Sequence, residues 1–147
     1  MKRLIMAKYS IKKQLKQAKI FLKKAKEDQI LVEEVINSER VSDEIIGYHC
    51  QQATEKLLKA VLTISEAKFR GTHNLTTLMD YAQDAGFPVP KELSILRMLT
   101  IYGTELRYDD VTIDKPFDRK NTLAQIKKLH TWAEELFEQK GSSFNDK

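Results

Sequence analysis

Apolar residues recur along most of the chain at intervals of three and four residues, which places them on one face of an α-helix. Polar and charged residues occupy the opposite faces, with lysines prominent in the first segment. No stretch shows the strict alternation of a half-buried strand. The pattern therefore predicts five helices, which cover residues 10–37, 42–65, 73–85, 90–107 and 118–139.

The residues at the ends of these segments suit helix termini. Ser42 and Thr72 are candidate N-caps for the second and third helices, because a hydroxyl can accept a hydrogen bond from a free backbone N–H of the first turn. Gly86 follows the third helix, where a left-handed residue commonly ends a helix, and Pro88 and Pro90 prevent its continuation. Gly103 lies inside the fourth helix, so its expected role is to allow close approach of another helix or a ligand.

Five helices with short links predict an all-α fold, an up-and-down antiparallel bundle of four long helices plus one short helix. We expect residues 1–140 to form this single domain. Residues 141–147 are Gly, Ser and charged or polar residues with one Phe, and we expect them to form a frayed tail. In the fourth helix, Leu93, Leu96 and Leu99 are expected to face the core.

Composition narrows the class of protein. A chain of 147 residues can bury one ordinary core. No window is apolar enough to span a membrane, and the apolar run after Arg3 is too short for a signal peptide. Cys50 is the only cysteine and lies on an apolar stripe, so we expect a buried hydrophobic side chain rather than a nucleophile, in a cytoplasmic protein without disulfides.

The net charge of +4 is unevenly distributed. Residues 1–26 contain ten basic side chains and no acidic one, whereas the remainder has fifteen basic against twenty-one acidic side chains, a net of −6. A basic first helix can attract phosphates or an acidic protein. It can equally be a solvated face that keeps the protein in solution, and the sequence does not distinguish these roles.

Three motifs in order resemble those of the HEPN family, the "higher eukaryotes and prokaryotes nucleotide-binding" domain. Residues 48–60 read YHCQQATEKLLKA, which is similar to the family's helix of an aromatic residue, His, a Gln-Gln-Ala core and Glu-Lys. His73-Asn74-Leu75 resembles the family's His-[Asp/Asn]-Leu at the next helix start. Arg107-Tyr108-Asp109 resembles its Arg-Tyr-x-Asp signature, with Asp110 as a second candidate for the acid. The resemblance extends over about residues 12–138.

The resemblance implies a helical bundle that forms a homodimer and binds a nucleotide, RNA or another protein. Small members of the family resemble companions of a separate minimal nucleotidyltransferase, as in a toxin–antitoxin system, and the chemistry would then belong to that partner. Which nucleotide, RNA or partner this chain would bind stays open. The ligand-binding side chains expected on this basis are Tyr48, Gln52, Glu55, Lys56, Lys59, His73, Arg107, Tyr108 and Asp109.

Arg107 is central to this expected site. It continues the inward stripe of the fourth helix, and a buried guanidinium needs a carboxylate partner, for which Glu55 is the first candidate and Asp109 the second. Such a pair could bind a ligand or only join two helices. Glu55 can also form an ordinary surface ion pair with Lys59, four residues on.

Catalysis is not expected. RNA-cleaving members of the family carry Arg four to six residues before His, whereas the first His after Arg107 is His130. His130 lies on an apolar face and suits a core histidine, and the three histidines are too dispersed for a metal site. We therefore expect no catalytic residue, metal or cofactor. The alternative is a metal-independent endoribonuclease with a composite site at a dimer interface.

Overall fold

The structure is a computed structural model that describes residues 2–65, 67–103 and 117–145. Its described residues form helices and no strand, which confirms the all-α prediction. The elements are α1 (Lys2–Val35), α2 (Asp43–Ile64), α3 (Leu75–Asp84), the 3₁₀-helix η1 (Lys91–Leu99), α4 (Thr100–Gly103) and α6 (Arg119–Asn145).

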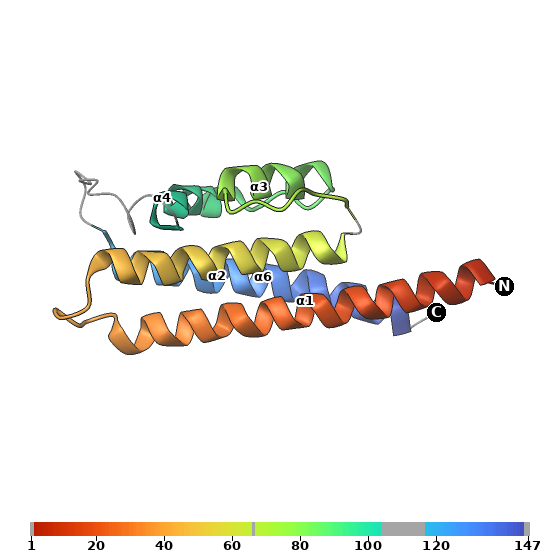
Figure 1. The fold of residues 1–147 in the computed structure, drawn as a ribbon, viewed down its shortest axis with the longest axis horizontal. Helices are drawn as coiled ribbons and strands as arrows, with labels where there is room; N and C mark the ends of the chain where they lie inside the picture. The colour runs from red at the N-terminus through yellow and green to blue at the C-terminus, as the bar shows by residue number, and fades with distance from the viewer. Residues whose placement is uncertain (1, 66, 104–116, 146–147) are drawn as a thin grey trace.

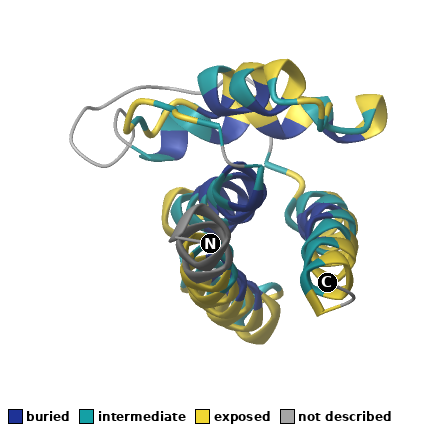
Figure 2. Ribbon diagram, turned by 90° about the vertical axis from the view of Figure 1, so that its right-hand side faces the viewer, coloured by how far each residue is buried: buried dark blue, intermediate teal, exposed yellow. Residues whose placement is uncertain are grey.

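The helices form two groups. The long helices α1, α2 and α6 run side by side, and α3, η1 and α4 lie together across the outer face of α2 (Figure 1). In the end-on view α2 is between the short elements and the two other long helices (Figure 2). Accordingly α2 contacts every other helical element described. More than half of its residues are buried, 13 of 22, so it is the central helix of the fold.

The predicted apolar stripes form the core. Leu57, Leu58 and Leu62 of α2 are completely buried. The leucines at positions 93, 96 and 99, which were expected to face inward, are buried as well. The other elements contribute the buried side chains Ala18, Leu22, Ala25, Val32, Leu75, Leu78, Met79, Ala82, Leu123, Ile126, Leu129 and Ala133. None of the described helices is both long and apolar enough to cross a lipid bilayer.

Two of the predicted helix ends are confirmed and one is wrong. The Ser42 hydroxyl accepts a hydrogen bond from the Ile45 N–H at 3.3 Å, and Gly86 has a φ of 90° just past α3. The N-cap of α3, however, is Asn74, whose Oδ1 accepts from the Thr77 N–H at 3.1 Å, so the helix starts at Leu75. The Thr72 hydroxyl instead accepts from the Asn74 N–H at 3.1 Å and forms the preceding turn.

The fourth long helix differs from its prediction. The segment forms η1 and the single turn α4, and residues 104–107 lie outside the described residues. Its buried leucines at positions 93, 96 and 99 are spaced by three, which matches the three residues per turn of a 3₁₀-helix. The hydroxyls of Ser94 and Thr100 also donate to carbonyls three residues earlier, at 2.7 and 2.9 Å.

The two terminal helices are longer than predicted. α1 begins at Lys2 and α6 continues through Gly141 to Asn145. Both ends extend past α2 on the same side of the molecule (Figure 1). Phe144 is half-buried, and its partial burial offsets part of the cost of the helical Gly141, which is about 1 kcal/mol relative to alanine.

Candidate functional site

Helix α2 carries polar side chains on two sides. Gln51, Glu55 and Lys59 recur every four residues, which aligns them along one face. His49 and Lys56 are seven residues apart and share a different face of α2, which contacts α1. We call the first set, together with Gln52 and His73, the Glu55 cluster, and the second set, together with Asp28 of α1, the Asp28 cluster.

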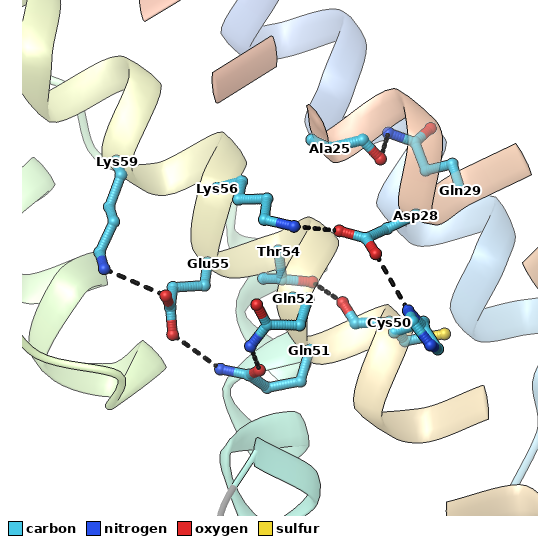
Figure 3. Close-up of polar contacts among 11 residues, drawn as sticks. Ala25, Asp28, Gln29, Cys50, Gln51, Gln52, Thr54, Glu55, Lys56 and Lys59 are labelled. Atoms are coloured by element: carbon cyan, nitrogen blue, oxygen red, sulfur yellow. Dashed lines mark hydrogen bonds and ion pairs between the residues drawn. The ribbon is translucent and has the colours of Figure 1, made fainter. Parts of the chain in front are cut away.

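The carboxylate of Glu55 is the centre of the first cluster. Its Oε1 accepts hydrogen bonds from Gln51 Nε2 at 3.0 Å and from His73 Nδ1 at 2.9 Å. Its Oε2 accepts from Lys59 Nζ at 3.0 Å (Figure 3). A carboxylate only accepts, so His73 carries its hydrogen on Nδ1. Glu55 is buried, and its three donors offset the cost of removing the charge from water.

These donors also determine the ionisation of Glu55. Burial by itself raises the pKa of this carboxyl group. The hydrogen bonds from His73, Lys59 and Gln51, together with the charge of Lys59, outweigh burial and hold the pKa below its ordinary value. Glu55 is therefore an ionised, fixed acceptor at neutral pH and not a proton donor.

Gln51 is a functional candidate that the sequence did not single out. It is completely buried, and besides Glu55 its amide contacts the His73 carbonyl oxygen at 3.4 Å. Gln52 Nε2 donates to Gln51 Oε1 at 2.7 Å (Figure 3). A Cβ added at Gly103 would lie 2.9 Å from the Gln51 side chain, so Gly103 does allow the close approach predicted for it. The sequence signal was the four-residue spacing from Glu55.

The Asp28 cluster lies between α1 and α2. Asp28 accepts hydrogen bonds from His49 Nδ1 at 3.0 Å and from Lys56 Nζ at 2.6 Å (Figure 3). All three side chains are largely buried, with exposures of 12–27%. Lys56 was expected to lie with Glu55, but the structure joins it to α1 instead. Asp28 was missed because its partners are 21 and 28 residues away, a distance that no local pattern reveals.

Of the remaining predicted site residues, one is described by the structure and three are not. Tyr48 packs edge-on against His49, with ring centroids 5.2 Å apart. Arg107, Tyr108 and Asp109 lie outside the described residues, so the pairing of Arg107 with Glu55 stays a prediction.

Two residues set aside from the site behave as expected. Burial, followed by the charge of Asp28, raises the pKa of the Cys50 thiol to about 12, so it is not a thiolate nucleophile. His130 Nδ1 accepts a hydrogen bond from Gln29 Nε2 at 2.8 Å, and burial lowers its pKa. His130 is thus the core histidine that its apolar surroundings predicted.

Comparison with known families identifies the fold. A family model described as "HEPN domain" matches residues 11–138, which is most of the chain and includes both clusters. The chain belongs to the HEPN family. No curated protein and no solved structure matches it significantly. The range agrees with the resemblance over about residues 12–138 found in the sequence.

The Glu55 cluster of this HEPN domain offers donors to a ligand. The His73 side chain is 71% exposed although its Nδ1 is anchored on a buried carboxylate, so its Nε2 is directed to the surface. Lys59 uses one of its three donors on Glu55. Phosphate oxygens and ribose hydroxyls are groups that such donors and acceptors recognise. Among the described residues, no three acidic, His or Cys side chains are grouped to hold a metal ion.

An apolar groove of about 470 Å³ lies beside α4 and was not predicted. Its walls come from η1, α4 and the start of α6, and include Ile95, Met98, Tyr102 and Phe117. The next residue after Tyr102 is Gly103, which packs on Gln51. The groove and the Glu55 cluster are therefore both built against α4.

Proposed function

We propose that this HEPN domain is a non-catalytic module that binds a nucleotide or nucleic acid at the Glu55 cluster. It acts with a separate minimal nucleotidyltransferase, in a toxin–antitoxin-like pair in the cytoplasm. The observation that carries the proposal is the anchoring of an exposed His73 and of Lys59 on one buried carboxylate, at 2.9 and 3.0 Å. Such an arrangement fixes two phosphate- or hydroxyl-binding groups in advance, which lowers the entropic cost of binding a ligand.

The states of the described titratable groups favour binding over catalysis. Glu55 is held ionised, so it is a poor general acid. Cys50 is held as a thiol, and His130 is half-buried in the α1–α6 contact. His49 is bound to Asp28 in the helix interface. These groups stabilise the bundle, and the donors that remain at the surface suit recognition of an anion.

The partner in this proposal is supported by family membership alone. The HEPN match covers residues 11–138, and the resemblance of small family members to nucleotidyltransferase companions supplies the class of partner. A binding module of this kind would present the substrate or hold the partner, and bond-making would occur in the partner's own active site.

One observation favours a second candidate, a metal-independent endoribonuclease. His73 is exposed and its Nδ1–H is directed at a buried carboxylate, which is how a general-base histidine is oriented. In such a reaction Nε2 would take the proton of a ribose 2′-hydroxyl, and the O2′ would attack the adjacent phosphorus. The bond from phosphorus to the 5′-oxygen would break, and that oxygen would leave with a proton from water. A cation from a second copy would complete the site.

Titration of ATP and of a short RNA against four proteins tests the proposal. In addition to wild type these are Lys59→Gln, Lys56→Gln and Arg107→Ala. Lys59→Gln and Lys56→Gln each remove one lysine–carboxylate bond from α2, but only Lys59 belongs to the Glu55 cluster. We expect Lys59→Gln to weaken binding about tenfold with the fold retained, since a bond to a charged group contributes roughly 1.5–3 kcal/mol, whereas Lys56→Gln binds as wild type does.

Other outcomes contradict specific parts of the proposal. A wild type that binds neither probe refutes an autonomous ligand site. RNA cleavage in the presence of a chelator, abolished by His73→Ala, establishes the ribonuclease instead. If Arg107→Ala lowers the melting temperature and leaves binding unchanged, Arg107 is a structural residue and not part of the ligand site.

A further inference from the structure

A buried amide and a histidine join α1 to α6. Gln29 of α1 is 2% exposed, and its Nε2 donates a hydrogen bond to His130 Nδ1 at 2.8 Å. The same nitrogen donates to the Ala25 carbonyl oxygen at 3.2 Å (Figure 3). Gln29 Oε1 is buried too, but it has no hydrogen-bond partner among the described residues. The amide of Gln29 is therefore held in the core by its N–H donors alone.

These two bonds determine which nitrogen of His130 carries the hydrogen. The amide nitrogen of Gln29 only donates, so His130 Nδ1 must accept and be unprotonated. Turning the amide over would place Oε1 against the Ala25 carbonyl oxygen, which is also an acceptor. The contact therefore selects the neutral imidazole with its hydrogen on Nε2.

A protonated His130 cannot keep this contact. A hydrogen on Nδ1 would point at the N–H donors of Gln29, and two buried donors would oppose each other. Burial acts in the same direction and is the main cause that lowers the pKa of His130. Of the charges that act on the ring, Glu134 of α6 raises the pKa, and Lys26 of α1 lowers it.

A groove of about 530 Å³ between α1 and α6 offers the protonated ring a second position. The two helices lie on either side below α2 in the end-on view (Figure 2), and His130 is part of the groove wall. Glu134 Oε2 is 3.7 Å from His130 Nε2, and its side chain is 54% exposed. The charged residues that line the groove are Lys19, Lys23, Lys26, Glu27, Glu134 and Glu138.

We propose that His130 is an acid-operated switch in the contact between α1 and α6. When neutral, it accepts the hydrogen bond of Gln29 and holds the two helices together. When protonated, it leaves Gln29, turns into the groove and pairs with Glu134, which loosens the contact. The switch shares no residue with the Glu55 cluster, so this inference does not rest on the proposed function.

The stability of the protein should fall as His130 takes up its proton. The folded-state pKa of His130 is below the unfolded-state value of about 6.5, so the unfolded chain binds the proton more tightly. The stabilisation is complete above the unfolded pKa and is lost as the pH falls through the folded pKa. Glu55 loses its own stabilisation only below a pH of about 4.3, so the two effects occupy separate ranges.

Nitrogen NMR of the imidazole rings in wild type tests the neutral state. The signals of His130 are those that disappear in His130→Gln. We expect Nδ1 to be unprotonated at neutral pH and the ring to titrate below about 6.5, the ordinary value for histidine. A hydrogen on Nδ1, or titration at or above the ordinary value, overturns the proposal.

Two further variants test the partners of the ring in the two positions. In Gln29→Glu, a carboxylate replaces the donor, and we expect the pKa of His130 to rise by about one unit or more. In Glu134→Gln, the protonated ring loses its partner in the groove, and we expect the pKa to fall further. The matched control is Glu135→Gln, an exposed neighbour on α6 that does not line the groove, which should titrate as wild type does. A Glu134→Gln variant that also titrates as wild type does would exclude the second position.

Urea denaturation and fluorescence test the release of α1 between about pH 8 and pH 5. The urea midpoint of wild type should fall as the pH is lowered, whereas that of His130→Gln should change much less, because its amide oxygen can accept the Gln29 bond without titrating. Trp132, the only tryptophan, is two residues from His130 and reports on α6. Its emission should change over the titration of His130 while circular dichroism shows a folded chain. An equal fall of the urea midpoint in both proteins, or an unchanged emission while the ring titrates, would overturn the switch.

Discussion

Glu55 shows how a single buried charge organises its surroundings. An ionised carboxylate in the core is costly unless it is paired and hydrogen-bonded. Glu55 meets this condition with three donors from three different residues, one on the preceding turn of α2, one on the following turn and one before α3. The arrangement links α2 to the segment that leads into α3, so the same contacts serve the proposed ligand site and the fold.

Replacing this carboxylate by an amide of the same shape should destabilise the protein. In Glu55→Gln, one oxygen is replaced by a donor that faces the Lys59 ammonium, so a buried bond is lost and two donors oppose each other. We expect the free energy of unfolding at neutral pH to fall by about 1–3 kcal/mol. Urea denaturation measures this, with the exposed Glu135→Gln as a control that should change stability by less than about 0.5 kcal/mol.

The same variant should reveal the pH dependence. The folded-state pKa of Glu55 is below its unfolded-state value, so its stabilisation is present above the unfolded pKa of about 4.3 and is lost as the pH falls through the folded pKa. The difference in the free energy of unfolding between wild type and Glu55→Gln should therefore become smaller at acidic pH. A constant difference from neutral to acidic pH would show that the loss is steric and not due to the charge.

At the scale of the elements, two close approaches fasten α4 to α2. Gly47 of α2 lies against Tyr102 of α4, and Gly103 of α4 lies against Gln51 of α2. A Cβ at Gly47 would overlap the Tyr102 ring, and a Cβ at Gly103 would meet the Gln51 side chain. Tyr102 is buried and also packs against the Phe117 ring, with centroids 5.2 Å apart and the rings tilted by 53°. A rigid ring held between a helix backbone and a second ring has little room to move.

Gly47→Ala should therefore cost stability despite the better helix propensity of alanine. The overpacking is expected to lower the free energy of unfolding by about 1–3 kcal/mol. Gly141→Ala is the matched control, because Gly141 is also helical but has open space around its Cβ position. It should raise stability by about 0.5–1 kcal/mol. Stabilisation by both substitutions would mean that α4 moves away from α2 easily.

Arg119 connects α6 to the loop between α1 and α2. Its guanidinium, at the start of α6, donates to Asp43 Oδ1 at 2.7 Å and to the carbonyl oxygens of Ser38 and Val41 at 2.7 and 2.8 Å. It thereby holds the loop between α1 and α2 onto α6. No local pattern reveals this role of Arg119, since the carbonyls it binds are about eighty residues away.

Arg119→Lys should destabilise the protein almost as much as removal of the Arg119 side chain. An ammonium cannot reproduce the planar fork that reaches Asp43 and three backbone carbonyls, those of Ile36, Ser38 and Val41. We therefore expect the melting temperature to fall by an amount equivalent to about 1–3 kcal/mol. The neighbouring Lys120→Ala, at an exposed position, should have little effect. If the melting temperature of Arg119→Lys equalled that of wild type, a single bond to Asp43 would be sufficient to hold the loop.

The elements that the sequence predicted well are those whose signal is local. The stripes of α1, α2 and α6, the Ser42 cap and the left-handed Gly86 all follow from residues a few positions apart. The prediction of an α-helix for the fourth segment was wrong, because leucines spaced by three are compatible with both an α-helix and a 3₁₀-helix. The structure has the 3₁₀-helix over Lys91–Leu99. Asp28 and Arg119 were missed because their partners are distant in sequence.

For the whole molecule, the uneven charge has a structural consequence. The excess of lysine over residues 1–26 and the acidic remainder meet along one groove between α1 and α6, which is lined by Lys19, Lys23, Lys26, Glu134 and Glu138. We expect charges so placed to contribute to the homodimer that the family resemblance implies. The attraction is also sensitive to salt, because the Debye length falls from about 10 Å at 0.1 M to about 3 Å at 1 M ionic strength.

Association of this kind must couple to stability. A partner that binds only the folded chain stabilises it, by about 2.7 kcal/mol when its concentration is a hundredfold above the dissociation constant. We therefore expect the melting temperature of wild type to rise with protein concentration at low salt and to become independent of it at 1 M salt. Lys23→Glu, which places an acid between Lys19 and Lys26 in this groove, should show a much weaker concentration dependence at either salt. A wild-type melting temperature that does not change with concentration at low salt would leave the groove without a second copy, whereas a dependence that survives 1 M salt would locate the dimer contact on an apolar face elsewhere.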